Sequence, residues 1–133
     1  MRPILFETLS KNQRLSIINL HVAVGLSDGK INSQDGDILE KLLNLCGVHI
    51  NECMEYFEHE GKNEQLVLDL VSLQAFMKKI IVVSIWDLII CDGKPNENEL
   101  SVAFTILNKL GINENRFYEI IEDKEKIMRH FGY

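Results

Sequence analysis

The sequence lacks an apolar stretch long enough to cross a bilayer. Its longest, IIVVSIWDLII at 80–90, contains Asp87, and it is far shorter than the roughly 20 apolar residues that a membrane-spanning helix needs. The first residues, MRPILFETLSKNQR, contain no apolar core of the kind found in signal peptides. We therefore expect 80–90 to be a buried core helix and predict no signal peptide and no membrane insertion.

Basic residues and paired cysteines are also scarce. Lys and Arg number 14 against 20 Asp and Glu, giving a net charge of −6. Because phosphate neutralisation needs clustered Lys and Arg, we expect no nucleic-acid partner. Three cysteines, an odd number without an export signal, are typical of reduced thiols in the cytoplasm. The acidic balance is compatible with a cation or a basic partner.

Catalytic signatures are absent from the sequence. It contains no GxSxG, P-loop, HExxH or Rossmann fingerprint. Cys91 stands beside Asp92 at the end of a predicted helix, where the carboxylate and the helix dipole both raise the pKa of a thiol. A nucleophilic cysteine needs the opposite. We predict that the protein is not an enzyme.

The two halves of the chain are similar to each other. At an offset of 64 positions, residues 28–57 align without a gap with residues 92–121 and share nine identities. Chance gives about one or two, so we infer an internal duplication. The identical pairs are Asp28/Asp92, Gly29/Gly93, Lys30/Lys94, Asn32/Asn96, Leu43/Leu107, Asn44/Asn108, Gly47/Gly111, Asn51/Asn115 and Glu55/Glu119.

Helical periodicity is present in both halves. Apolar residues after each Asp-Gly pair follow the i, i+1, i+4, i+5, i+8 spacing of one helix face, and Gly47 and Gly111 are the expected terminators. More uniformly apolar segments at about 9–26 and 73–90 predict two central helices that are buried on most sides. Shorter helices are expected at about 4–8 and 65–71. The predicted N-caps are Thr8, Ser72, Asn32, Asn96, Asn51 and Asn113.

These patterns predict an all-α protein with no strands. We expect a single compact bundle of six to eight helices forming one domain over residues 1–133. Two pseudo-symmetric repeats, at about 4–60 and 65–130, build it around the two central helices. Neither half is expected to fold alone, because each central helix needs a partner for its second apolar face.

The segment SDGKINSQD at 27–35 has the spacing of the second half of a calcium loop. Aligning Gly29 with the loop glycine puts Asp28 and Asp35 at ligand positions. The first ligand positions hold Val24 and Leu26, which have no side-chain oxygen, and the second copy is equally apolar there. Because calcium takes six to eight oxygen ligands, neither copy is a working EF-hand.

Two interpretations of these DG turns remain open. In the first, the glycines end one helix, the asparagines cap the next, and Asp35 and Glu99 complete capping boxes. This leaves Asp28 and Asp92 unexplained. In the second, pseudo-symmetry brings Asp28, Asp35, Asp92 and Glu99 together with Asp87 into one or two acidic pockets for a divalent cation or a basic partner.

The duplicated order of helix, DG turn, amphipathic helix, LG-type turn and helix resembles the tellurite-resistance TerB-like family. SDGKINSQD at 27–35 and CDGKPNENE at 91–99 carry the resemblance, with CGV at 46–48 and LGI at 110–112. It implies a non-catalytic helical domain linked to metal or chemical stress responses, used beside membrane or chaperone components. It also implies divalent-metal binding by the acidic residues. By position these are Asp28, Asp35, Asp92 and Glu99.

This sequence departs from the family pattern at several positions. Ser27 and Cys91 stand where the family has a small alanine, and Pro95 replaces an aliphatic residue. The first copy has Asp35 where the family has Glu. The departures concern the metal site more than the fold.

A cluster of cysteines and histidine gives a separate metal hypothesis. Cys46, His49 and Cys53 supply three of the four ligands that structural zinc requires. The repeat mates of the two cysteines are Leu110 and Phe117, which indicates that both are small buried core residues. We favour the core interpretation.

Asp87 is unusual because it lies among apolar neighbours. Its carboxylate needs a donor, a water or a cation if it is buried. The alternatives are a buried hydrogen bond, an exposed stripe on the helix, or a part in the acidic pocket.

The sequence thus supports two functional hypotheses. The first is a TerB-like binding module that engages a divalent cation or a basic partner through its DG turns. The second is a protein-interaction or scaffold domain in which the turns are structural, and it predicts an exposed apolar patch or a homodimer interface.

Overall fold

The computed structural model describes residues 9–28, 33–56, 58, 62–91 and 95–126. All regular structure in these ranges is helical, which confirms the all-α prediction. The elements are α1 (Lys11–Gly25), the 3₁₀ helix η2 (Leu26–Asp28), α2 (Ser33–Cys46), α3 (Ile50–Tyr56), α4 (Lys62–Val71), α5 (Ala75–Ile89), α6 (Glu97–Lys109) and α7 (Glu114–Glu122). The short helix expected at about 4–8 lies outside the described residues.

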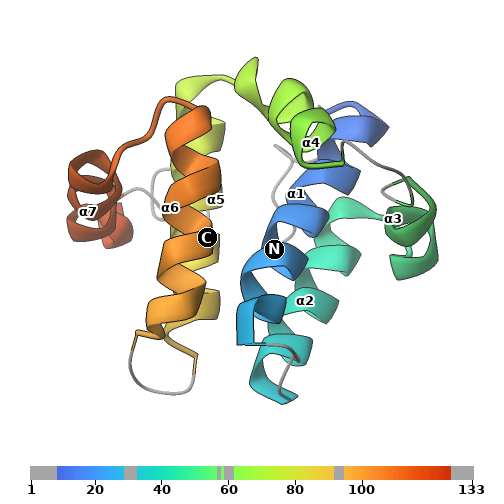
Figure 1. Cartoon of the computed structure of the whole chain (residues 1–133), viewed down its shortest axis with the longest axis horizontal. Coiled ribbons are helices and arrows are strands. Elements are labelled where there is room, and N and C mark those ends of the chain that lie inside the picture. Colours follow the sequence, from blue (N-terminus) through green and yellow to red (C-terminus); the bar gives the residue numbers. More distant parts are fainter. Residues whose placement is uncertain (1–8, 29–32, 57, 59–61, 92–94, 127–133) are drawn as a thin grey trace.

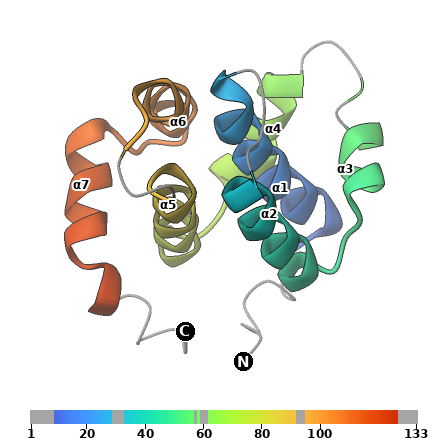
Figure 2. The ribbon, with the colours of Figure 1, turned by 90° about the horizontal axis from the view of Figure 1, so that it is seen from below.

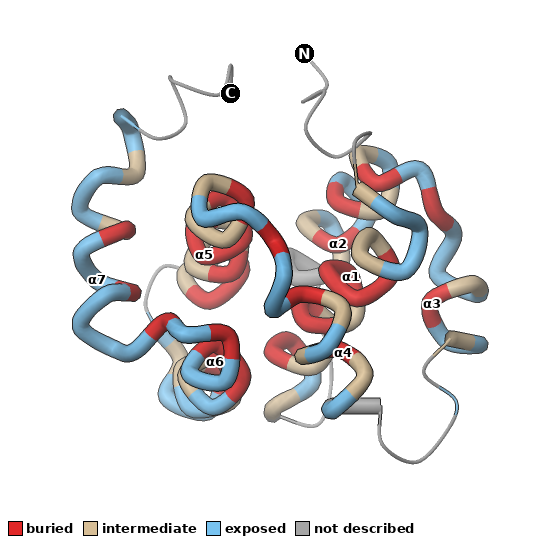
Figure 3. The backbone as a smooth tube through the Cα atoms, turned by 90° about the horizontal axis from the view of Figure 1, so that it is seen from above, coloured by how far each residue is buried: buried red, intermediate tan, exposed pale blue. Residues whose placement is uncertain are grey.

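Helices α1 and α5 form the centre of the bundle. Helix α1 packs against α2, α3, α4, α5 and α6. Seen from below, α3 and α7 lie on opposite outer sides with the other helices between them (Figure 2). Buried positions concentrate on α1 and α5, whereas the outer side of α7 is exposed (Figure 3). The two segments predicted as helices apolar on most sides are therefore the core helices.

Helices α2 and α6 both end in a glycine turn. Gly47 and Gly111 have φ of 67° and 88°, the left-handed conformation that glycine adopts without strain. The amide of Val48 donates to the Leu43 carbonyl at 3.2 Å, and the corresponding bond from Ile112 reaches Leu107 at 3.0 Å. These are Schellman bonds, and they confirm the predicted terminators.

The predicted N-caps are only partly right. Asn96 and Asn113 cap α6 and α7 by accepting from the amides three residues on. Asn51 is wrong as a cap, because α3 begins at Ile50 and the carbonyl of His49 accepts from the amides of the first turn. His49 is the repeat mate of Asn113. The helices α3 and α7 therefore begin at equivalent positions, but the residue before the helix differs between the two copies.

The N-caps of the two central helices lie two residues later than predicted. Helix α1 is capped by Ser10, which forms a complete capping box with Gln13. Ser72 is wrong as a cap, since it lies in the turn that ends α4, and α5 starts after Gln74. Thr8, Asn32, Gly29 and Gly93 lie outside the described residues.

Asp69 on α4 links three helices through its carboxylate. Its Oδ2 accepts from Ser16 of α1 at 2.6 Å and from Tyr56 of α3 at 2.8 Å, and its Oδ1 accepts from Gln65 at 2.9 Å. Ser16 is fully buried. Burial, together with Asp69, raises the pKa of Tyr56, so its hydroxyl remains a donor. The network ties α3 and α4 to the central helix.

Replacing Asp69 with alanine is expected to lower the free energy of unfolding by about 2–3 kcal/mol, because the buried Ser16 hydroxyl loses its charged acceptor. Urea denaturation followed by circular dichroism measures this. Adding Ser16→Ala should recover part of the loss, since it removes the orphaned donor. A change below about 0.5 kcal/mol in Asp69→Ala, the usual range for surface substitutions, would show that the network contributes little.

Candidate functional site at the DG turns

The described residues on either side of the two DG turns lie at one end of the bundle. Helix α1 runs into η2, which carries Asp28, and α2 and α6 begin at the same lower end in Figure 1. The helix η2 packs against both α1 and α6. We call η2 and the first turns of α2 and α6 the DG-turn end. The described residues that lead into the first DG turn thus lie beside α6, the helix that follows the second DG turn.

Glu99 is the fully described member of the predicted acidic set. Its backbone N–H donates to the N-cap oxygen of Asn96 at 3.1 Å. Its side chain belongs to a residue only 5% exposed, whereas Glu97 in the same turn is exposed. Burying a carboxylate is costly unless polar groups or a cation oppose its charge, and the N-terminal position offsets part of that cost. This burial goes beyond what helix capping requires.

Ser27 adds a second buried polar atom at the DG-turn end. It lies in η2, next to Asp28 and in the element that packs on α6. Its Oγ is buried and has no hydrogen-bond partner among the described residues. A hydroxyl oxygen and a carboxylate are therefore both withdrawn from solvent here.

The other predicted site residues are placed in part. Asp28 lies in η2 and Asp35 in the first turn of α2, but their side chains lie outside the described part of the chain, as does all of Asp92. The elements that carry Asp28 and Glu99 are in contact, through the packing of η2 on α6.

Asp87 forms an ion pair. Lys124, which follows α7, donates from Nζ to Oδ1 of Asp87, and the side chains of Lys124 and Asp87 are 35% and 40% exposed. The carboxylate is thus half-buried and bonded to a cationic donor, which lies between the buried hydrogen bond and the exposed stripe.

The zinc alternative does not assemble. Cys46 and Cys53 are buried in the core, as their repeat mates predicted, whereas His49 is exposed. Within the described ranges, no three His, Cys, Asp or Glu side chains group closely enough to hold a metal ion. Burial, with a contribution from Glu52, raises the pKa of Cys53 to about 11, so its thiol stays protonated and is a poor ligand.

A cavity lies at the opposite end of the bundle. It has a volume of about 180 Å³ and lies where α5 begins, α6 ends and α7 passes. Its lining residues are Ala75, Lys78, Lys79, Leu110, Gly111, Ile112, Arg116 and Ile120. No motif in the sequence predicts this cavity. The available signal is the reversal of charge between the repeat mates Glu52 and Arg116.

No protein-family model, curated protein or solved structure matches this chain. Across the described residues, none of the helices combines the length and apolar character needed to cross a membrane.

Proposed function

We propose that the protein is a non-catalytic helical binding module, of the TerB-like type, that takes up a divalent cation at the DG-turn end. The burial of Glu99 in the first turn of α6, the helix against which η2 packs, carries the proposal. A carboxylate withdrawn from water gains most from a nearby positive charge. Together with Ser27 and the acidic residues of both DG turns, it supplies the oxygen ligands that Mg²⁺ and Ca²⁺ prefer.

The two-repeat arrangement is part of this proposal. Helices α1, α2 and α3 begin at residues 11, 33 and 50, and α5, α6 and α7 each begin 64 positions later. Both halves also end their second helix with the same glycine turn. A duplicated unit of this kind supports a site to which both copies of the DG motif contribute residues.

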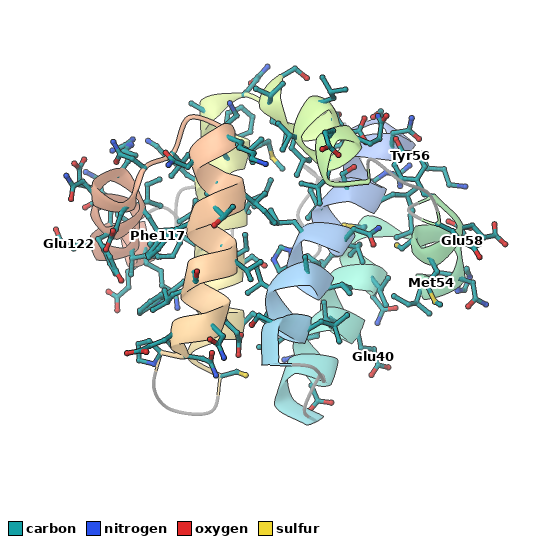
Figure 4. All side chains as sticks on the ribbon, in the orientation of Figure 1. Glu40, Met54, Tyr56, Glu58, Phe117 and Glu122 are labelled. Atoms are coloured by element: carbon teal, nitrogen blue, oxygen red, sulfur yellow. The ribbon has the colours of Figure 1, made fainter. Side chains whose placement is uncertain are left out.

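The second candidate is a protein-interaction domain with purely structural DG turns. Met54 on α3 and Leu68 on α4 are 63% and 66% exposed, and Figure 4 shows Met54 at the outer side of the molecule. Exposed large apolar side chains favour contact with a partner or a second copy when they form a continuous patch. The cation titration below separates the two candidates.

The test is an amide-resolved NMR titration with Mg²⁺, Ca²⁺, Mn²⁺ and Zn²⁺ in turn. We expect saturable shifts, or broadening with Mn²⁺, centred on residues 28–35 and 92–99. Glu99→Gln should abolish them, because it keeps the side-chain shape and removes the buried charge. Glu97→Gln is the matched control, since this residue lies in the same helical turn but is exposed.

Diffuse shifts over all carboxylates, or equal responses from the two variants, would sink the cation proposal and leave the interaction domain. Sedimentation of the free protein over a concentration series then tests for a homodimer, the interface that the second candidate predicts.

A further inference from the structure

The cavity at the start of α5 has a cationic lining in an acidic protein. Three of its eight lining residues are Lys78, Lys79 and Arg116, and none is Asp or Glu. The whole chain has only 14 basic residues against 20 acidic ones. Charges of one sign that converge on a concave surface raise the local concentration of the opposite ion.

The corresponding position in the first half of the chain has one hydrogen bond in common with the cavity. There, Arg14 of α1 donates from Nη1 to the carbonyl of Cys46 at 2.8 Å. Lys78 is the repeat mate of Arg14, and its Nζ donates to the carbonyl of Leu110, the mate of Cys46, at 3.4 Å. A basic side chain thus holds the end of the second helix in both halves.

The two halves differ in the residues that lie next to this basic side chain. In the first half Lys11 and Glu52 form an ion pair at 3.5 Å. Their repeat mates are Ala75 and Arg116, so the second half has a small residue in place of one partner and the opposite charge in place of the other. The second half therefore replaces a neutral pair with a positively charged opening.

The start of the central helix also differs between the two halves, because the second copy lacks a side-chain cap. Helix α1 starts with the capping box of Ser10 and Gln13, whereas the side chain of Gln74 makes no capping hydrogen bond to α5. The first turn of α5, like that of α1, contains no acidic residue. The positive end of the α5 dipole thus adds to the charge of the three cations rather than being offset by a carboxylate.

We propose that this cavity binds a small phosphate-type oxyanion, held by Lys78, Lys79 and Arg116 beside the start of α5. Its volume of about 180 Å³ is below the roughly 300–1,000 Å³ of pockets for drug-sized ligands, so a compact anion fits. Arg116 also contacts Glu119 at 3.1 Å on the exposed side, a pair that a phosphate with two negative charges would outcompete.

The site is independent of the cation proposal. It lies at the opposite end of the bundle from the DG-turn end, as the positions of α5, α6 and η2 show (Figure 1), and the ligands carry opposite charges. Failure of either proposal therefore leaves the other standing.

The test titrates the whole protein with inorganic phosphate and with phenyl phosphate, at constant ionic strength with chloride as reference. NMR shifts of the amides of residues 75–79 and 110–112 report binding. Lys79→Gln is expected to weaken binding about tenfold, the size of one charge-assisted hydrogen bond. Tighter binding of phenyl phosphate assigns an esterified phosphate as the ligand, and tighter binding of inorganic phosphate assigns the free ion.

A double substitution recreates the first-half arrangement in the second half. Ala75→Lys with Arg116→Glu should remove saturable binding and still give a folded protein, because the same pair occurs naturally at Lys11 and Glu52. Lys11→Gln is the matched control, since it removes one positive charge away from the cavity and should leave phosphate binding unchanged. Shifts equal to those in chloride, or unchanged binding in both cavity variants, overturn the proposal.

Discussion

Replacing Phe117 with alanine is expected to lower the free energy of unfolding by about 3–5 kcal/mol, the usual cost of removing a fully buried aromatic ring. Phe117 of α7 is 0% exposed and points inward toward α6 in Figure 4. It makes edge-to-face contacts with Trp86, Phe104 and Tyr118 at centroid distances of 6.0, 5.2 and 5.4 Å. Such contacts add stability beyond the buried area itself.

Urea unfolding followed by both circular dichroism and tryptophan fluorescence measures the effect. Trp86 is the single tryptophan of the chain and one of the contacted rings, so its emission reports the docking of α7 on α5. The control is Tyr118→Ala on the same helix, at 38% exposure, which should cost roughly 1 kcal/mol, as partly exposed positions do. If the two variants were equally stable, Phe117 would not be the residue that anchors α7.

The helices were predictable from the sequence because their signals are local. Apolar spacing and two glycines located α2 and α6, and the offset of 64 positions carried the pattern into the second half. Asn51 was predicted as a cap together with Asn113, whereas the structurally equivalent pair is His49 and Asn113. The two positions hold different residue types, so the sequence does not mark the first of them as a cap.

Long-range polar contacts were not predictable because nothing in the local sequence marks them. The repeat mate of Asp69 is Leu5, which has no polar side chain, and the three partners of Asp69 come from α1, α3 and α4. The pairing of Asp87 with Lys124 spans 37 positions. Which charged residues form such pairs can be identified only when the packing of the helices is known.

The candidate sites show the same difference between local sequence signals and long-range contacts. The acidic residues of the DG turns were foreseen because they form a repeated motif. The burial that distinguishes Glu99 from Glu97 was not, because it depends on how the helices pack in the folded bundle. The cationic cavity was not predictable from the repeat, because it arises where the two copies differ, at Lys11/Ala75 and Glu52/Arg116.

His21 makes the core sensitive to acid. It is fully buried in α1, where Nδ1 donates to the Ile17 carbonyl at 2.7 Å and Nε2 accepts from the Ser84 hydroxyl of α5 at 2.8 Å. The carbonyl can only accept, so the proton of the neutral ring lies on Nδ1. Desolvation by burial outweighs the bond to Ile17 and lowers the pKa of His21 from 6.5 to about 4.

We expect this histidine to reduce the free energy of unfolding by about 2 kcal/mol between pH 7 and pH 5. The unfolded chain binds a proton at His21 as the pH falls through 6.5, while the folded protein stays unprotonated until about 4. The stability that the neutral ring provides above pH 6.5 is therefore lost progressively between those two values. Urea denaturation at pH 7, 6 and 5 gives the slope.

The matched variant is His21→Leu with Ser84→Ala, which removes the titrating ring and its hydroxyl partner together. An aliphatic side chain suits the position, because the repeat mate of His21 is Ile85, which is itself fully buried. Carboxylates titrate in both proteins, so only the difference between their slopes belongs to His21. If the free energy of unfolding fell equally with pH in both proteins between pH 7 and pH 5, His21 would have the same pKa in the folded and unfolded states. The ring would then be protonated within the folded core, and its burial would not lower its pKa.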